Sequence, residues 1–205
     1  MTKSRRLGIL GGTFDPIHIG HLATAEAVRM EYGLDTILFI PSANPPHKQD
    51  VDVTDASHRY AMTVLATESN PHFDVSKIEM ERKGLSYTLY TLQELLALYG
   101  EDTELYFITG ADALAELHTW HNIRGVLELT HFIAASRPGI DKTDEIIKSF
   151  GELGKAKIHR LTIPELEISA TDIRQRVAEG RSIRYIVPDA VVQYIEENKL
   201  YQPKK

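Results

Sequence analysis

Two histidines follow a glycine pair near the start of the chain. Residues 11–22 read Gly-Gly-Thr-Phe-Asp-Pro-Ile-His-Ile-Gly-His-Leu, which places the imidazoles at His18 and His21. Glycines allow backbone N–H groups to approach a phosphate closely, and imidazoles add hydrogen-bond donors beside it. These residue types in this order indicate a site for a nucleotide polyphosphate, with chemistry at one phosphorus atom.

The elements expected on either side support this interpretation. The apolar run Leu7–Leu10 predicts a buried strand, and Ala23–Tyr32 predicts a helix. A glycine-rich turn that leads from a strand into a helix brings a phosphate to the helix N-terminus, where free N–H groups favour negative charge. We therefore expect phosphate contacts from the Gly11–Gly12 backbone, from Thr13 and from the segment 18–21.

Other interpretations of this segment are weaker. The chain contains neither G-x-x-x-x-G-K-[ST] nor G-x-G-x-x-G in this region, which disfavours an NAD-dependent oxidoreductase. His18 and His21 could also face one another as metal ligands, but a zinc site needs further ligands, and the chain has no cysteine and no H-E-x-x-H pattern. Phosphate contact therefore ranks above metal ligation, and both rank above a plain turn with surface histidines.

Length and composition limit the class of protein. The 205 residues suit one domain, residues 1–205, in which about 165–205 would form a small C-terminal helical part. A net charge of −6 argues against a general nucleic-acid surface, and the absence of cysteine excludes disulfides and thiol catalysis. The apolar runs are too short for a signal peptide or a membrane span, so a cytoplasmic location is expected and no membrane partner is predicted. The sequence does not decide between a monomer and a homodimer.

Strand-like and helix-like segments alternate along the chain, which favours an α/β fold with a parallel sheet and helices on both faces. The further expected strands are Ile37–Ile40, Phe73–Met80, Leu105–Thr109 and His131–Ala135. The further expected helices are Ser57–Glu68, Thr88–Tyr99, Ser169–Glu179 and one that opens at Pro188, with a surface helix and loop in Asp141–Lys157. Because ligands bind at the carboxyl ends of such strands, the segments 11–21, 41–48 and 110–112 should converge on one rim.

Four segments in this order resemble known proteins. Residues 11–21 resemble the H-x-G-H signature of the nucleotidyltransferase superfamily. Pro45-Pro46-His47-Lys48, Gly110-Ala111-Asp112 with Trp120, and Ile168–Arg174 resemble one branch, the bacterial nicotinate-nucleotide adenylyltransferases. The likeness runs from about the first strand to the last helix, and the ordered set is far more specific than any single piece.

The resemblance implies a Rossmann-like fold and transfer of AMP from ATP to nicotinate mononucleotide. The products would be nicotinate adenine dinucleotide and pyrophosphate, a step in NAD synthesis, with Mg²⁺ accompanying ATP. The 5′-phosphate of the acceptor already carries a nucleophilic oxygen at neutral pH, so neither a general base nor a covalent enzyme intermediate is required. Catalysis would then rest on positioning and on charge stabilisation at the α-phosphorus.

Site residues follow from the matching positions. The expected catalytic residues are His18, His21 and Arg174. The expected ATP-binding residues are Gly11, Gly12, Thr13, Phe14, Gly20, Gly110, Asp112, Ser169 and Thr171. The expected contacts to nicotinate mononucleotide are His47, Lys48, Ser86, Tyr87, Thr88, Trp120, His121 and Arg137. No protein metal site is expected.

For several of these residues, the neighbouring sequence also predicts a structural role. Ser86 or Thr88 is expected to cap the helix that follows, and the resemblance gives Thr88 and nearby backbone N–H groups to the nicotinate carboxylate. Trp120 has polar neighbours, which favours an exposed platform on which a pyridine ring could stack. The prolines before His47 and Lys48 stiffen their loop, and Pro41–Asp55 is the segment expected to move when substrate binds.

Two positions depart from the family pattern, and several activities stay open. Ala170 replaces the second serine of the family's I-S-S-T-x-x-R, and His121 stands where many relatives carry tyrosine after the tryptophan. Nicotinamide mononucleotide is the nearest alternative acceptor. A pantetheine-phosphate adenylyltransferase shares both phosphate motifs but is typically shorter and has no use for Trp120. A nucleotide-binding regulator that has lost turnover is the alternative from another class.

Overall fold

The computed structural model describes residues 5–43, 53–136, 142–163 and 166–203, without the side chains of Ala111, Asp112 and Ser136. Within these residues six parallel strands form one sheet in the order β3-β2-β1-β4-β5-β6. The strands are β1 (Arg6–Gly12), β2 (Thr36–Pro41), β3 (Phe73–Val75), β4 (Glu104–Gly110), β5 (Thr130–Ser136) and β6 (Ile158–Thr162). Successive strands are added outward in one direction from β1 to β3 and in the opposite direction from β4 to β6. A doubly wound sheet binds its ligand in the crevice at this reversal, between β1 and β4.

Strand register brings the carboxyl ends together at this crevice. Gly12 pairs with Pro41 at the end of β2, and Leu10 pairs with Ile108 near the end of β4. Gly110 in turn pairs with Ala135 near the end of β5. The segments that follow β1, β2 and β4 therefore leave the sheet at one rim, as the sequence predicts.

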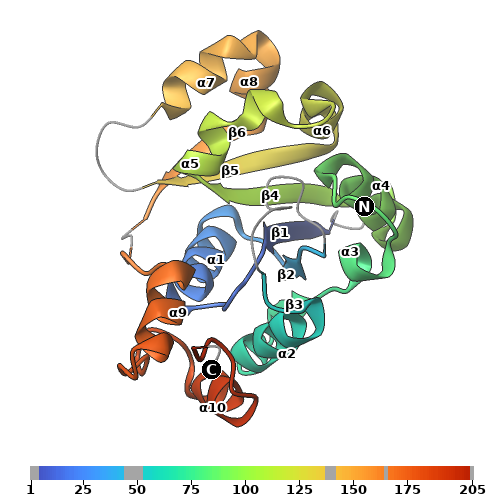
Figure 1. The fold of residues 1–205 in the computed structure, drawn as a ribbon. Coiled ribbons are helices and arrows are strands. Elements are labelled where there is room, and N and C mark those ends of the chain that lie inside the picture. Colours follow the sequence, from blue (N-terminus) through green and yellow to red (C-terminus); the bar gives the residue numbers. More distant parts are fainter. Residues whose placement is uncertain (1–4, 44–52, 137–141, 164–165, 204–205) are drawn as a thin grey trace.

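Helices cover both faces of the sheet (Figure 1). One face carries α1 (Ile19–Tyr32), α2 (Ala56–Thr67), α9 (Ala170–Ala178) and α10 (Asp189–Glu197). The other carries α3 (Ile78–Glu81), α4 (Thr88–Tyr99), α5 (Ala111–Ala115), α6 (Ile123–Leu129), α7 (Thr143–Ser149) and α8 (Gly151–Lys157). The expected C-terminal helical part therefore packs onto the same core as α1. This is the Rossmann-like architecture that the sequence predicts.

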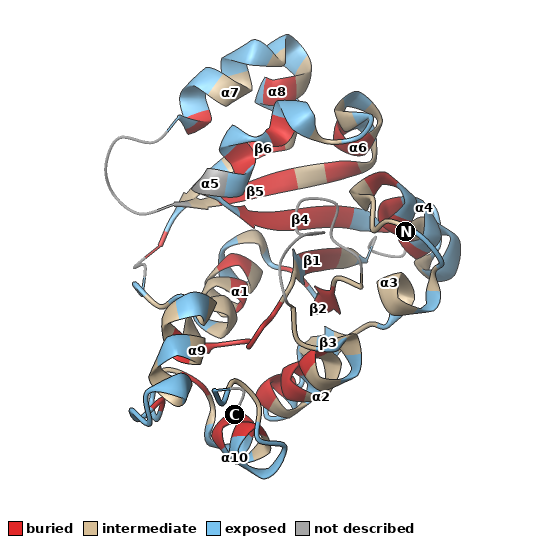
Figure 2. Cartoon of the chain, viewed as in Figure 1, coloured by how far each residue is buried: buried red, intermediate tan, exposed pale blue. Residues whose placement is uncertain are grey.

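Successive residues of a strand point to opposite faces of the sheet and pack into two separate hydrophobic cores. Leu7 and Ile9 of β1 point into the core under α4, α5 and α6, whereas Leu10 joins the core under α1, α2, α9 and α10. The same alternation separates Phe107 from Ile108 in β4. Burial on both faces explains why the strands appear as continuous apolar runs in the sequence, and Figure 2 shows the central strands as the buried layer.

Some expected elements are corrected. The strand expected over Phe73–Met80 ends at Val75, and a short helix, α3, begins at Ile78. The edge strand β6 and the helices α5 and α6 were not expected. In β6 Ile158 is the one buried residue, and the polar residues His159, Arg160 and Thr162 interrupt the apolar run that would have indicated a buried strand. The first helix begins at Ile19 rather than Ala23, so Gly20 and His21 are helical.

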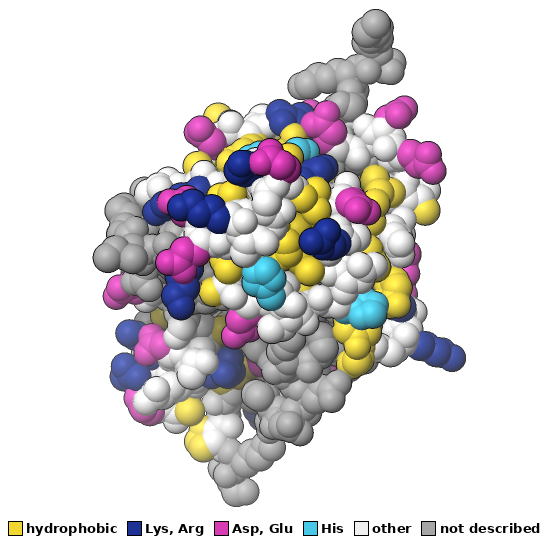
Figure 3. All heavy atoms as spheres, turned by 90° about the horizontal axis from the view of Figure 1, so that it is seen from above, with side chains coloured by type: hydrophobic (Ala, Val, Ile, Leu, Met, Phe, Trp, Pro, Cys, Tyr) yellow, Lys and Arg dark blue, Asp and Glu magenta, His cyan; other side chains and the backbone are white. Residues whose placement is uncertain are grey.

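The face of the molecule seen in Figure 3 carries charges of both signs. On the face shown in Figure 3, basic and acidic side chains alternate rather than gather into a patch of one sign among the described residues. None of the described helices is both long and apolar enough to cross a membrane.

Candidate active site

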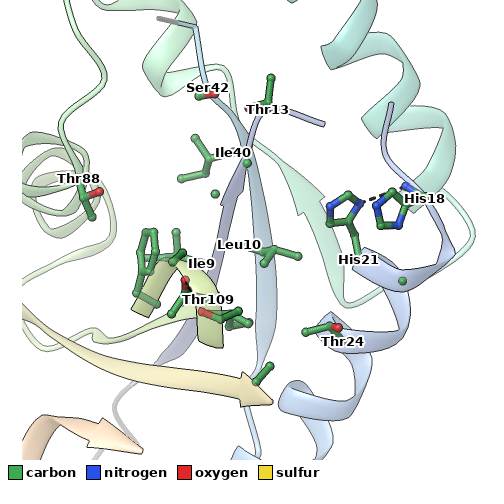
Figure 4. A pocket seen from close by; sticks show the side chains of 18 of the residues that line it. Ile9, Leu10, Thr13, His18, His21, Thr24, Ile40, Ser42, Thr88 and Thr109 are labelled. Atoms are coloured by element: carbon green, nitrogen blue, oxygen red, sulfur yellow. Dashed lines mark hydrogen bonds between the residues drawn. The ribbon is translucent and has the colours of Figure 1, made fainter. Parts of the chain in front are cut away.

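A cavity of about 540 Å³ opens at the carboxyl ends of the strands. The predicted site residues that line it are Gly11, Gly12, Thr13, His18, Gly20, His21, Ser86, Thr88, Gly110 and Trp120. Figure 4 shows His18 and His21 on one side and Thr88 on the opposite side, with Ile9 and Ile40 between them. The cavity therefore has a histidine end and a second end at the start of α4.

The two histidines form a stacked pair at the start of α1. His18 precedes the helix and His21 lies in its first turn, with ring centroids 3.6 Å apart and an interplanar angle of 26°. The backbone N–H of His18 donates to Nδ1 of His21 over 3.2 Å. A neutral His21 whose Nδ1 accepts this bond carries its proton on Nε2, so the ring keeps one N–H donor for a ligand.

Burial keeps both rings uncharged near neutral pH. Desolvation lowers the pKa of His18 to about 4. Desolvation, followed by the charge on His18, lowers the pKa of His21 to about 3. Nδ1 of His18 is also buried without a hydrogen-bond partner in the described part of the chain. An unsatisfied buried nitrogen is costly, so a ligand or an ordered water beside it would gain a hydrogen bond.

Small and aromatic neighbours hold this pair in place. The ring of Phe14 is 3% exposed and meets His21 edge-on, with centroids 5.1 Å apart. A Cβ on Gly12 would stand 2.9 Å from the Phe14 ring, and one on Gly20 would stand 3.1 Å from Nδ1 of His18. Phe14 therefore supports His21 from behind, and the two glycines leave room for the rings. Gly11 and Gly12 lie at the end of β1 rather than in a turn, which corrects the expectation.

Arg174 joins the two predicted phosphate motifs. Its Nη1 donates to the carbonyl oxygen of Asp15 over 2.7 Å, and its Nη2 donates to the hydroxyl of Thr171 over 3.3 Å. Ser169 is the N-cap of helix α9, as the sequence predicts. Its hydroxyl accepts the backbone N–H of Asp172 over 3.1 Å. Ile168, one residue before this cap, lines the cavity. The start of α9 is thus at the cavity rim, with Ser169 and Thr171 exposed.

The start of α4 forms the other end of the cavity. Tyr87 occupies the cap position and makes no side-chain cap bond, so the expected capping by Ser86 or Thr88 is wrong. Thr88 is the first helical residue and lines the cavity. The first turn of a helix leaves backbone N–H groups free for an anion.

Trp120 is a partly buried wall of the cavity, which corrects the expectation of an exposed platform. Its ring packs edge-on against Phe107 and Phe132, with centroids 5.6 and 5.8 Å away. His121 is exposed and lies over the Tyr87 ring at 4.6 Å. Tyr87 and His121 therefore contact each other beside the cavity rather than lining it.

Sequence reasoning missed a buried polar cluster behind the Gly12–Pro16 loop. Arg59 is 2% exposed and donates to the carbonyl oxygens of Thr13 and Thr54 over 2.7 and 2.8 Å. Asp15 is 6% exposed, and its carboxylate accepts the hydroxyl of Tyr201 over 2.7 Å and the N–H of Thr54 over 3.2 Å. Arg59 lies on the same helix face as Met62 and Ala66, so a charge within an apolar stripe was the available signal.

Some expected contacts fall outside the described residues. These are His47 and Lys48, which lie within the undescribed residues 44–52, and Arg137. The side chain of Asp112 is likewise not described, although its backbone is the second residue of α5, which begins at Ala111 directly after Gly110. Their roles, and the expected motion within Pro41–Asp55, stay predictions.

Comparison with known proteins supplies the family. A model described as cytidylyltransferase-like matches residues 9–176, which include both phosphate motifs. A probable nicotinate-nucleotide adenylyltransferase of Thermoanaerobacter sp. (strain X514) is 52% identical over 204 residues, covering 98% of this chain and 97% of the relative. A probable nicotinate-nucleotide adenylyltransferase of Moorella thermoacetica is 50% identical over 206 residues, covering 100% of this chain and 95% of the relative.

A solved structure shares the fold. The Plasmodium falciparum nicotinic acid mononucleotide adenylyltransferase complexed with NaAD superposes with a TM-score of 0.78 at 20% identity, covering 96% of this chain and 97% of that one. The likeness extends over nearly the whole of both chains, so the doubly wound sheet and its flanking helices are common to the two.

Proposed function

The chain belongs to the cytidylyltransferase-like family, and on that premise we propose that it is a nicotinate-nucleotide adenylyltransferase. It transfers AMP from ATP to nicotinate mononucleotide, which yields nicotinate adenine dinucleotide and pyrophosphate for NAD biosynthesis. The full-length identity of about half to relatives that carry this name supports the assignment. The cytoplasmic location, the absence of a nucleic-acid or membrane partner and the open homodimer stay predictions.

One observation carries the proposal: a single cavity joins the stacked histidines to the start of α4. Its volume of about 540 Å³ lies within the range of roughly 300–1,000 Å³ that is usual for small-molecule sites. A site for adenylyl transfer must hold a triphosphate and an acceptor side by side. The histidine end suits the phosphates, and the end with Thr88 and Trp120 suits a pyridine ring that carries a carboxylate.

The histidine end stabilises charge without moving a proton. His21 presents a neutral Nε2–H, which can donate to an oxygen on the α-phosphorus as negative charge grows there. Its ring is already fixed by His18 and Phe14, so little reorganisation accompanies the reaction. The attacking oxygen belongs to the acceptor's 5′-phosphate, and pyrophosphate leaves with the electron pair of the broken P–O bond. Binding and orientation therefore account for the rate.

Arg174 and the start of α9 are assigned to the leaving phosphates. A guanidinium donates in a fork that matches phosphate oxygens, and part of that fork is already fixed on Asp15 and Thr171. Ser169 and Thr171 add hydroxyls at a helix N-terminus. We assign Mg²⁺ to the substrate, as Mg·ATP, because this ion is usually held by substrate phosphates and waters rather than by an all-protein cage.

Pyrophosphate release from Mg·ATP tests the proposal. Nicotinate mononucleotide, nicotinamide mononucleotide and phosphopantetheine are offered separately. We expect a strong preference for the first, and release only with phosphopantetheine would move the chain to the pantetheine-phosphate enzymes. The His21→Ala variant should still bind ATP but form little product. No release with any acceptor, despite ATP binding, would instead favour a regulator.

A further inference from the structure

A carboxyl group stands in the wall of the acceptor end of the cavity. Glu79, on α3, lines the cavity together with Ser86 and Thr88. Its Oε1 accepts the hydroxyl of Thr91 over 2.9 Å, and its carboxyl group also hydrogen-bonds the side chain of Ser86. This carboxyl group is therefore fixed in place beside the turn that receives the pyridine ring. A negative charge here needs an explanation if the acceptor itself carries a carboxylate.

Arg82, whose charge lowers the pKa of Glu79, is already paired with another carboxylate. Arg82 donates to both oxygens of Glu94, over 2.8 and 2.7 Å, and to the hydroxyl of Thr91 over 3.1 Å. Because Arg82 donates to this hydroxyl, the Thr91 proton points to Glu79. Glu79, Arg82 and Glu94 together carry one surplus negative charge when Glu79 is ionised. Desolvation raises the pKa of Glu79, in agreement with that imbalance.

We propose that Glu79 is a specificity-determining residue, whose carboxyl group senses the charge of the substituent on the acceptor's pyridine ring. This inference rests on the proposed function. When Glu79 is ionised, it repels a nicotinate carboxylate and leaves a neutral nicotinamide amide nearly unaffected. When Glu79 is protonated, that repulsion disappears. Preference for the acid over the amide is therefore strongest at low pH and weakens as pH rises.

The groups that face Glu79 are few among the described residues. Arg82 lowers its pKa through charge, and Glu94 of α4 raises it. Strand β2, against which α3 packs, carries no ionisable side chain in Thr36–Pro41. Across the cavity, His18 and His21 are neutral above about pH 4. Among the described residues, Glu79 is therefore the one carboxyl group that lines the cavity.

The test is the ratio of two KM values, nicotinate mononucleotide over nicotinamide mononucleotide, at pH 5.5 and pH 8.5. The acceptors share the ribose 5′-phosphate, so titration of that group cancels in the ratio. In the parent enzyme we expect the ratio to rise by roughly three- to tenfold with pH. In Glu79→Gln the ratio of the two KM values should be the same at pH 5.5 and pH 8.5. At pH 8.5 this ratio should be lower than in the parent enzyme. Glu81→Gln, an exposed neighbour on α3, is the matched control and should behave like the parent.

A structural role for Glu79 would give a different result. Loosening of α3 or α4 should raise both KM values together and leave their ratio unchanged, which would overturn the inference. If Glu79→Gln does not fold, Thr91→Val removes one hydroxyl that stabilises the carboxylate, and it should shift the pH dependence to higher pH. An unchanged profile in that variant would overturn the inference as well. A parent enzyme inactive with both acceptors would refute the proposed function itself.

Discussion

At the scale of single residues, the site depends on two imidazoles that stay neutral. His21 donates through Nε2 because its Nδ1 accepts a backbone N–H, and both rings have pKa values far below the ordinary 6.5. The glycines, threonine and histidines at this junction of strand and helix predict a phosphate contact, which stays a prediction. Their stacking, and the support from Phe14, depend on the path of the chain and could be seen only in the structure.

These lowered pKa values predict that stability falls on the acid side. Between pH 6.5 and about 4 the unfolded chain protonates His18 and the folded chain does not, so the free energy of unfolding decreases as pH falls. The slope from this group is at most about 1.4 kcal/mol per pH unit. Urea unfolding at pH 7 and pH 5 measures it. His18→Asn should lose less stability than the parent between these values, whereas His72→Asn, at an exposed position, should match the parent.

Arg174 is predicted to act through its fork rather than its charge alone. Arg174→Lys keeps the charge but cannot hold Asp15, Thr171 and a phosphate together. We expect kcat/KM to fall by about 10²- to 10³-fold, as for loss of one donor at a developing charge. Arg176→Ala on the same helix, where Arg176 pairs with Asp172 on the surface, is the control and should retain activity. Equal activity in the parent and Arg174→Lys would remove Arg174 from the site.

At the scale of elements, the sheet was predictable and its outer parts were not. Strands β1, β2, β4 and β5 are buried on both faces and therefore appear as apolar runs. Strand β6 lies at the sheet edge and has one buried residue, Ile158, and α5 and α6 are short helices with few periodic positions. The pattern of apolar residues in the sequence therefore predicts strands that are buried on both faces more reliably than strands at the edge of the sheet.

The α7–α8 pair offers a test that separates folding from catalysis. A Cβ on Gly154 would stand 2.9 Å from Cβ of Phe150 and would press on the backbone of Ile147. Backbone cannot move aside easily, so Gly154→Ala should reduce the free energy of unfolding by about 1–3 kcal/mol. No described residue of α7 or α8 lines the cavity, so KM for both substrates should not change. Lys155→Ala, exposed on α8, should leave stability nearly unchanged. A variant as stable as the parent would contradict this packing.

At the scale of the whole molecule, the end of the chain supports its beginning. Tyr201 donates to Asp15 in the Gly12–Pro16 loop, and Arg59 holds the same loop by the carbonyl oxygen of Thr13. Burial, with the nearby Asp15 charge, raises the pKa of Tyr201, so its hydroxyl remains a donor. No local sequence pattern connects positions 15 and 201, because the contact depends on where α10 packs.

Tyr201→Phe therefore should affect the distant site. The variant leaves a buried carboxylate oxygen without its donor, which costs about 1–3 kcal/mol of stability. The loosened loop should raise KM for ATP more than KM for the acceptor. Tyr185→Phe is the control, since Tyr185 is 88% exposed. If both KM values and the stability of Tyr201→Phe equal those of the parent, Tyr201 does not support the loop.

The central claim is adenylyl transfer, and the position of a phosphorus label tests it most directly. The enzyme is given nicotinate mononucleotide with Mg·ATP labelled at either the α- or the γ-phosphate, and the products are separated. We expect the α-label to appear in nicotinate adenine dinucleotide and the γ-label in pyrophosphate. A γ-label in the pyridine nucleotide, or both labels retained in ATP while nucleotide is bound, would contradict it.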